Sequence, residues 1–456
     1  MGGWVMLFRS VHLISENKIS GKGVFSMLSL YRWKALTIFI AFVLFLSSFE
    51  LAAADQVLEV YNPAGVREDG ASLDKLLKAV MSAVGMTRPP LAGEFPEAKV
   101  EKVIIAKDAF AEINELFYKR GWGDGLPIVP PTVERVREML RGTDIPPDEV
   151  ISIVPPKKGQ ATAEKIAVNA VMAGCRPEYM PVLIAAVEAI AEQEFNLSMV
   201  GTTTSNDCPL LIVSGPIARQ LDINSGSNAL GRGWRANASI GRALHMVINN
   251  IGGSWPGVND MSTLGHPGEF ANCLAEIEEG NPWGPLHAEL GFSKESNVVT
   301  VVTAESYQAV VGLGLTSEQF LNRLSSRLVG LKSGYLPATL VILNYDTVDI
   351  LNGDGWTRSR IKEYLAERAA PSASDDKMWS AKDGRQSAGA QGSAPKAADA
   401  NGVAPVSSAD QFLILVAGGP PGEKNMVVPF WPGSKPVSKE IKLPANWKEL
   451  LPKETR

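Results

Sequence analysis

The chain has 456 residues, with 44 Lys and Arg against 49 Asp and Glu, and a formal net charge of −5. Its hydrophobic content of 45% and charged content of 20% are those of an ordinary globular protein, long enough for two or three domains. No basic block stands out, so the composition argues against a nucleic-acid partner.

The first 54 residues differ from the rest. From residue 27, two basic residues precede an apolar run over residues 35–46, and three alanines stand before Asp55. This order is typical of a secretory signal peptide over residues 27–54. The run is shorter than the about 20 residues of a membrane span. We therefore expect an exported protein, periplasmic or extracellular, cleaved near Ala54 and free of the membrane afterwards; an uncleaved anchor is the alternative.

Residues 55–106 are expected to form an N-terminal arm that includes a helix over Leu73–Val84. The main domain, residues 107–368, opens with an amphipathic helix over Lys107–Arg120. After a loop punctuated by Gly and Pro, Thr132 is placed to cap a helix over residues 133–140.

The rest of the main domain alternates apolar strands with helices. The expected strands are Val150–Val154, Ser198–Thr203, Pro209–Val213, Val298–Val302 and Ala338–Leu343. The expected helices are Ala163–Ala173, Glu178–Glu192, a helix from near Asn237 to Ile251, Gly268–Glu279, Thr316–Leu328 with Ser317 as its cap, and Arg358–Arg368. Such alternation predicts an α/β fold, with a mixed or mostly parallel sheet flanked by helices.

Residues 369–408 are rich in Ala, Ser and Gly and have almost no large apolar side chain, which predicts a disordered linker or insertion. Residues 409–456 form the C-terminal segment, with apolar strands over Gln411–Ala417 and Val427–Trp431. A strand that returns after the linker is expected to complete the sheet of the main domain.

The loop before the helix near Asn237 is rich in Gly, Ser and Asn. Its glycines allow close approach to a ligand, its arginines add positive charge, and the first helical turn leaves N–H groups unpaired. These features favour a small polar or anionic ligand; a structural glycine turn is the alternative. The predicted substrate-binding residues are Asn224, Ser225, Asn228, Arg232, Gly233, Arg235 and His245, with Arg242 further along the helix.

Three histidines, His245, His266 and His287, fall within 43 consecutive residues that also contain several carboxylates. A histidine with a carboxylate beside it is a workable general base near neutral pH. We therefore predict His266, His287 and Glu289 as catalytic residues, with structural histidines as the alternative. The same groups suit a divalent metal, but their spacing fits no standard zinc motif, so no metal site is predicted.

The chain has three cysteines, an odd number. Cys175 stands beside Arg176 and just before a helix start, and both features stabilise a thiolate. It is therefore a candidate nucleophile, against the alternative of a small buried residue in a helix–helix turn. Cys208, at the entrance of a strand, has the same two interpretations. The polar turn over residues 202–207 is a candidate ligand contact or a turn capped by its own side chains.

Three long motifs suggest a family. They are Gly121-Trp-Gly-Asp-Gly-Leu-Pro-Ile-Val-Pro-Pro, Ala170-Val-Met-Ala-Gly-Cys-Arg-Pro-Glu-Tyr-Met-Pro, and the stretch from Asn224 to Arg242 that contains Trp-Arg-Ala-Asn-Ala-Ser-Ile-Gly-Arg. Over residues 107–310 the chain resembles a poorly characterised bacterial family whose members accompany small proteins with a UGSC (seleno)cysteine motif. The resemblance implies redox or thiol chemistry, with Cys175 as the matching residue. The chain departs from the family pattern in its leader and its Ala/Ser-rich insertion, and it has no Cys-Gly-Ser-Cys of its own.

Two hypotheses follow from the sequence. The first is an exported enzyme that acts on a small polar or anionic substrate, with a reaction linked to thiol or redox chemistry and a cofactor that the sequence does not identify. The second is a non-catalytic periplasmic protein, either a solute binder or an accessory protein of a (seleno)cysteine redox partner.

Overall fold

The structure is a computed structural model that describes residues 56–61, 100–105, 108–330, 338–368, 408–420 and 422–451. The chain forms two compact units, one of Met1–Val57 with Ile104–Ala109 and one of Leu58–Val103 with Phe110–Arg456. The predicted leader, the helix over Leu73–Val84 and most of the Ala/Ser-rich segment lie outside the described residues. Among those described, no helix is long and apolar enough to cross a membrane.

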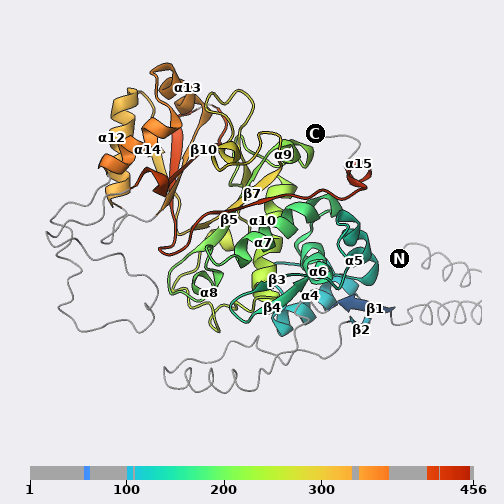
Figure 1. Cartoon of the computed structure of the whole chain (residues 1–456). Coiled ribbons are helices and arrows are strands. Elements are labelled where there is room, and N and C mark those ends of the chain that lie inside the picture. Colours follow the sequence, from blue (N-terminus) through green and yellow to red (C-terminus); the bar gives the residue numbers. More distant parts are fainter. Residues whose placement is uncertain are drawn as a thin grey trace, which may run out of the picture. The chain divides into compact units, whose positions relative to one another are not determined.

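The α/β class is confirmed (Figure 1). The helices are α4 Ala109–Arg120, α5 Val133–Met139, α6 Ala163–Ala173, α7 Met180–Ala191, α8 Leu197–Val200, α9 Pro216–Gln220, α10 Arg235–Asn250, α11 Leu286–Glu289, α12 Ser317–Gly330, α13 Tyr345–Gly353, α14 Arg358–Arg368 and α15 Trp447–Leu450. Short 3-10 turns are η1 Leu140–Gly142, η2 Pro177–Tyr179, η3 Pro267–Glu269 and η5 Ala409–Gln411. The strands are β1 Gln56–Tyr61, β2 Val100–Ile105, β3 Val150–Val154, β4 Gly159–Thr162, β5 Cys208–Ser214, β6 Cys273–Ala275, β7 Val298–Ala304, β8 Gln308–Val311, β9 Thr339–Leu343, β10 Phe412–Val416, β11 Lys424–Pro429 and β12 Val437–Glu440.

Eight of the strands form two four-stranded sheets instead of one, and the pairs β1-β2 and β3-β4 form two-stranded sheets. The first four-stranded sheet has the order β12-β7-β5-β6 and the second the order β10-β9-β11-β8. Each sheet has one parallel pair, β5 with β6 and β9 with β10, and its other pairs are antiparallel. The sheets are therefore mixed and not mostly parallel. The prediction that the C-terminal strand returns to the main domain is confirmed, because β10 pairs with β9 from Phe412–Thr339 to Val416–Leu343.

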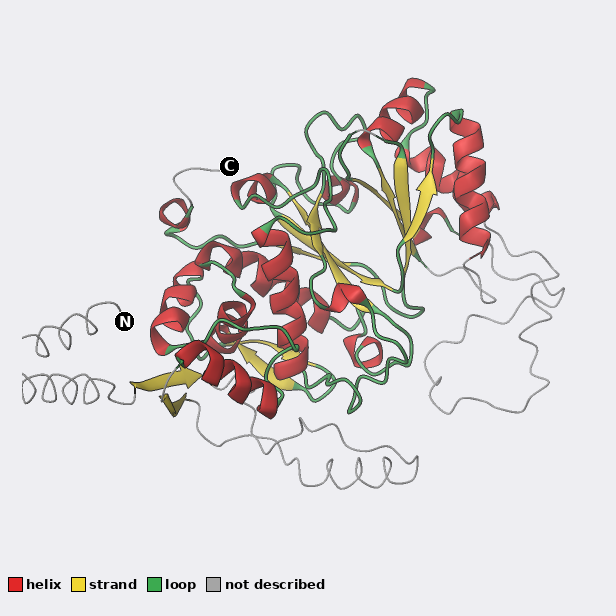
Figure 2. Ribbon diagram, turned by 180° about the vertical axis from the view of Figure 1, so that it is seen from behind, coloured by secondary structure: helices red, strands yellow, loops and turns green. Residues whose placement is uncertain are grey.

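The two sheets pack face to face, and helices cover their outer sides (Figure 2). Alternate residues of each strand face opposite sides, so β9 sends Leu340 and Ile342 into the core between the sheets and Val341 and Leu343 towards α12, α13 and α14. The first sheet is covered on its other face by α7 and α10. The strands β5, β7 and β9 are buried on both faces, which explains their continuous apolar sequences.

The two sheets have the same strand connectivity, and each receives its edge strand from the other half of the domain. In each, a central strand is followed by helices, by a parallel neighbour and by an antiparallel return strand, as β5-β6-β7 and as β9-β10-β11. Strand β8 follows β7 in the chain but pairs with β11 of the second sheet. Strand β12 follows β11 in the chain but pairs with β7 of the first sheet. Each half of the domain thus completes the sheet of the other.

Helix α10 is a core element. It packs against α6 and α7, and only Arg235, Ala238, Arg242 and Asn249 along it are not buried. A Cβ atom at Gly241 would lie 2.4 Å from the backbone nitrogen of Asn272, so this helix and the chain before β6 approach more closely than any side chain allows.

Two predicted elements are wrong. The expected strand over Ser198–Thr203 is the short helix α8 and a turn, in which the Thr202 hydroxyl donates to the Ser198 carbonyl at 2.8 Å. Such local bonds compete with strand pairing. The expected helix over Gly268–Glu279 is η3 followed by β6, because β5 offers a paired edge to Cys273–Ala275. The cap of α12 is Thr316, which accepts from the Gln319 N–H, and not Ser317.

Candidate functional site

A cysteine–histidine pair lies where β5 begins. The Cys208 Sγ atom is 3.2 Å from the His266 Nδ1 atom. That nitrogen also accepts the backbone N–H of Gly268 at 2.9 Å, so it carries a lone pair and the thiol is the donor in the contact. The arrangement is that of a nucleophile with a general base at hydrogen-bond distance.

Both side chains are held by their local structure. His266 caps the turn η3, and the Glu269 carboxylate accepts the His266 backbone N–H at 2.8 Å. The Asn272 side chain donates to Cys208 Sγ at 3.4 Å and to the Pro209 carbonyl at 3.0 Å. Residues from the β5 entrance and from the loop before β6 therefore fix the pair from two sides.

The pair is neutral in its resting form. Burial raises the pKa of the Cys208 thiol well above its usual value, and the negative charges of Glu269 and Asp207 raise it further. Burial also lowers the pKa of His266. Cys208 is only 1% exposed, whereas His266 is half-buried, so the imidazole is the member of the pair that a solute meets first.

Carboxylates surround the pair. Burial raises the pKa of Asp207 to about 7; the Ser205 side chain opposes this rise and the Glu305 charge adds to it. Burial likewise raises the pKa of Glu305, Glu269 and Asp260. A group of carboxyls with raised pKa values beside a nucleophile is typical of a functional site. When ionised, these carboxylates attract cations and repel anions.

His245 lies close to this group on α10. Burial lowers the pKa of His245 to about 4, a contact with the Pro209 backbone opposes the fall, and the charge of His266 adds to it. The ring is therefore neutral at physiological pH. Of the three predicted histidines, His245 and His266 come together and His287 does not join them.

Cys175 is placed differently from the prediction. Its thiol donates to the Ser239 carbonyl of α10 at 3.2 Å, and burial raises its pKa to about 12. The guanidinium of the adjacent Arg176 instead contacts Glu178 at 3.1 Å. This geometry favours the structural alternative, a neutral thiol in a helix–helix turn, over a thiolate.

The Asn224–Arg235 loop is braced mainly by its own amides. The Asn224 side chain bonds to the Ser227 carbonyl and the Gly226 N–H, and Asn228 donates to the Arg232 carbonyl at 2.7 Å. The Ser225 carbonyl accepts the Gly418 N–H at 2.7 Å. The exposed tip holds Arg232, Gly233 and Arg235. Arg235 precedes His245 by ten residues on α10, or about 15 Å along the helix, so the loop and the Cys208–His266 pair are separate places.

A second polar cluster, the Glu276 cluster, lies beyond the end of β6. Its members are Glu276, Glu278, His287, Glu289, Arg358 and Lys362. Arg358 bridges Glu276 at 3.2 Å and Glu289 at 3.3 Å, and Lys362 pairs with Glu289. Burial raises the pKa of Glu276 to about 8, which the Arg358 charge opposes. The predicted catalytic residues His287 and Glu289 both belong here, where ion pairs join the loop after β6 to α14.

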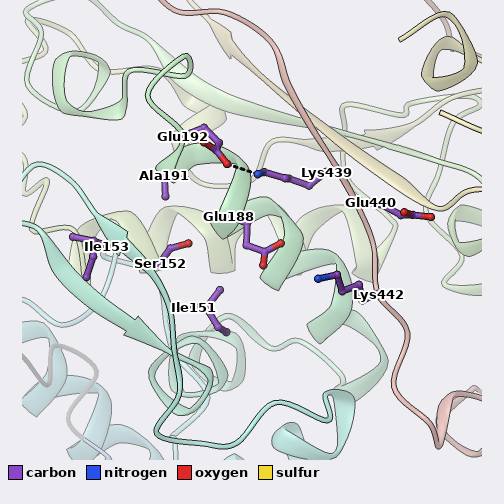
Figure 3. Close-up of a pocket in the computed structure, with 9 residues that line it drawn as sticks. All are labelled: Ile151, Ser152, Ile153, Glu188, Ala191, Glu192, Lys439, Glu440 and Lys442. Carbon is purple, nitrogen blue, oxygen red and sulfur yellow. Dashed lines mark hydrogen bonds and ion pairs between the residues drawn. The ribbon is translucent and has the colours of Figure 1, made fainter. Parts of the chain in front are cut away.

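An open groove of about 510 Å³ lies elsewhere, between β3, the end of α7 and the segment around β12 (Figure 3). Glu192 and Lys439 form an ion pair across it, and Glu188 and Lys442 also line it. None of the predicted site residues lines this groove, and it contains no cysteine or histidine.

Asn272 and Glu305 are not among the predicted site residues, whereas Cys208 and the turn that contains Asp207 are candidates that the sequence leaves open. The sequence carries a weak signal for two of them, since Asp207 and Cys208 end a polar turn before an apolar strand. No protein-family model matches the chain, and no curated protein matches it. The proposed function therefore rests on the geometry and chemistry of the Cys208–His266 pair.

Proposed function

We propose that this protein is an enzyme with thiol-linked chemistry centred on Cys208 and His266, acting on a small polar substrate. The observation that carries the proposal is the 3.2 Å contact between the Cys208 thiol and the unprotonated His266 Nδ1 atom. In this mechanism His266 Nδ1 releases the Gly268 N–H and accepts the thiol proton as the sulfur attacks an electrophilic atom of the substrate. Asp207, whose pKa burial raises to about 7, would supply a proton to the leaving group.

The charge around the pair selects the substrate. The carboxylates of Asp207, Glu269 and Glu305 favour an uncharged or cationic compound over an anion. This favours the polar substrate over the anionic one expected from the Asn224–Arg235 loop, since Arg232 precedes α10 and Arg235 is its first residue, about 15 Å along the helix from His245. We also propose, from the order of residues 27–54, that the chain is exported.

Alkylation of the native protein tests the proposal. Iodoacetamide is expected to modify Cys208 faster than the similarly buried Cys273, which serves as a control within the same molecule, as measured by peptide mass spectrometry over time. The anionic iodoacetate should react more slowly at Cys208. A His266→Asn variant is expected to slow only the Cys208 reaction, by about 100-fold, because it removes the base.

Two outcomes contradict the proposal. One is that Cys208 reacts no faster than Cys273 in the folded protein, and the other is that His266→Asn leaves the Cys208 rate unchanged. A turnover screen with small uncharged thioesters and amides then follows, in which Cys208→Ser should abolish activity and Cys273→Ser should retain it.

A second candidate function is that of an accessory protein for a redox partner. It is favoured by the loop that carries His266, where Leu264 is 87% exposed, Phe270 48% and Met261 38%. Exposed apolar groups beside a reactive site suit a protein partner. An enzyme reacts with small probes and substrates alone, whereas an accessory protein would stay inert until a thiol-containing partner protein is added.

A further inference from the structure

The Glu276 cluster contains a buried histidine nitrogen that no hydrogen bond uses. His287 is 0% exposed, and its Nδ1 atom has no hydrogen-bond partner among the described residues. Its Nε2 atom lies 3.3 Å from the Lys294 carbonyl. A carbonyl only accepts, so Nε2 carries the proton and Nδ1 keeps a free lone pair. A buried acceptor left without a donor is costly, and so a ligand for it is expected.

Two carboxylates face the same point. The Glu278 Oε1 atom is 3.8 Å from His287 Nδ1, and one atom each from Glu276, Glu278 and His287 lie within 4.8 Å of one another. The carboxylates are oriented by backbone donors, since Glu278 Oε1 accepts the Gly215 N–H at 2.5 Å and Glu276 Oε2 accepts the Leu286 N–H at 2.7 Å.

Glu278 is the carboxylate of the cluster without a cation in contact. Arg358 and Lys362 contact Glu276 and Glu289 instead. Among the described residues no Lys or Arg pairs with Glu278, and the His287 ring faces it with Nδ1 at 3.8 Å. A metal cation between Glu278 and His287 would supply the missing partner.

We propose that Glu276, Glu278 and His287 form a structural site for one divalent transition-metal ion, with His287 Nδ1 as the nitrogen ligand. Two carboxylates and an imidazole suit Zn²⁺ or Mn²⁺ and not Ca²⁺, which takes oxygen ligands. The carbonyl of Lys294 on the far ring nitrogen is the partner that metal-bound histidines usually have.

The ligand atoms must move closer together to bind an ion. In a tetrahedral site with bonds of about 2.1 Å, two ligand atoms lie about 3.4 Å apart. The three atoms lie within 4.8 Å of one another, so they must close by up to about 1.4 Å. Glu278 has the most room to move, because its side chain is 27% exposed whereas those of Glu276 and His287 are 0% exposed. That exposed side also gives the ion a path into the site and leaves room for a water as a further ligand. The ion would join the end of β6 to α11, close to Arg358 of α14.

Metal analysis of the purified chain tests the site. After treatment with a chelator and equilibration with Zn²⁺, we expect one Zn²⁺ per chain by elemental analysis and a higher thermal unfolding temperature than in the chelated protein. Mg²⁺ should give neither result. Co²⁺ in place of Zn²⁺ should give visible absorption bands that report nitrogen and oxygen ligands.

Matched variants distinguish a specific Zn²⁺ site from nonspecific Zn²⁺ binding by acidic side chains. Glu278→Gln should weaken Zn²⁺ binding by about 100-fold or more, because it removes a ligand. Glu279→Gln, a neighbour whose side chain is 88% exposed, should leave it unchanged. If His287→Gln does not fold, the Glu278 comparison still decides. The proposal fails if no stoichiometric Zn²⁺ is bound, or if both glutamine variants bind it equally. These residues are not those of the Cys208–His266 pair, so either proposal can fail without the other.

Discussion

At the scale of single residues, the site depends on which groups are buried together. Cys175, Cys208 and Cys273 all have a thiol whose pKa is raised by burial, yet only Cys208 has a histidine at hydrogen-bond distance. Burial also raises the pKa of Asp207, next to Cys208 in the chain, to about 7. Reactivity therefore follows from neighbours in space and not from residue type.

The Asp207 carboxyl should make stability depend on pH. Its pKa is about 7 in the folded protein and near 3.9 when unfolded, so the folded state holds the proton more tightly. Its contribution is complete below about pH 4 and is lost as the pH rises to about 7. An Asp207→Asn variant removes this loss and should gain up to about 4 kcal/mol of unfolding free energy at pH 8 relative to pH 4.

Urea unfolding of wild type and Asp207→Asn at a series of pH values measures this difference. His245 and the other titrating groups are common to both proteins, so they cancel in the comparison. Asp349→Asn, at an exposed position of α13, serves as the control and should show no such trend. Equal pH dependence in wild type and Asp207→Asn would show that folding does not raise the pKa of Asp207.

At the scale of elements, α10 organises the glycine-rich loop after α4. The Arg242 guanidinium bonds to both oxygens of Asp124, at 2.6 and 2.8 Å, and also to the Pro127 carbonyl at 3.0 Å. The two side chains are only 15% and 9% exposed. The loop over residues 121–131, which is rich in Gly and Pro, is thus bound to α10. The same helix lies beside the Cys208–His266 pair.

Breaking this contact should be costly. Arg242→Ala leaves the Asp124 carboxylate largely buried without its partner, and we expect a loss of about 3 kcal/mol in the free energy of unfolding. Arg242→Lys should lose part of this, because an ammonium cannot make the two parallel bonds. The control is Arg219→Ala, which removes an exposed pair with Glu279 at 3.6 Å and should cost less than about 1 kcal/mol. Similar losses at both positions, measured by chemical denaturation, would mean that the Asp124 pair is no stronger than a surface one.

At the scale of the whole molecule, the exchanged edge strands make the two sheets interdependent. β8 and β12 each leave the sheet of the strand before them and pair in the other, and the backbone joins the halves again where the Glu305 N–H bonds to the Pro429 carbonyl. The end of the second sheet also reaches the Asn224–Arg235 loop, since Gly418 bonds to Ser225. The C-terminal segment is therefore part of the core of the domain.

Gly419 tests this long-range packing. A Cβ atom there would lie 1.9 Å from the Ser227 hydroxyl oxygen and 2.4 Å from the Ser227 backbone nitrogen. Because a backbone atom cannot simply rotate away, Gly419→Ala should lower the free energy of unfolding by about 1 to 3 kcal/mol. Gly353→Ala, where nothing lies within 4 Å, should be nearly neutral. An unchanged thermal midpoint for Gly419→Ala would show that the loop and the C-terminal segment are not packed together.

The sequence by itself determined what depends on neighbouring residues in the chain. The periodicity of apolar residues predicted α14 over Arg358–Arg368 and the buried strand β7, and Thr132 marked the start of α5, because helix faces, strand burial and caps are local properties. Tertiary structure decided whatever needed a distant partner. Cys273–Ala275 is a strand because β5 lies beside it, and Cys208 has a base because the chain returns 58 residues later with His266. The histidines that the sequence grouped together were separated for the same reason: strand pairing placed His266 at the entrance of β5 and His287 beyond the end of β6.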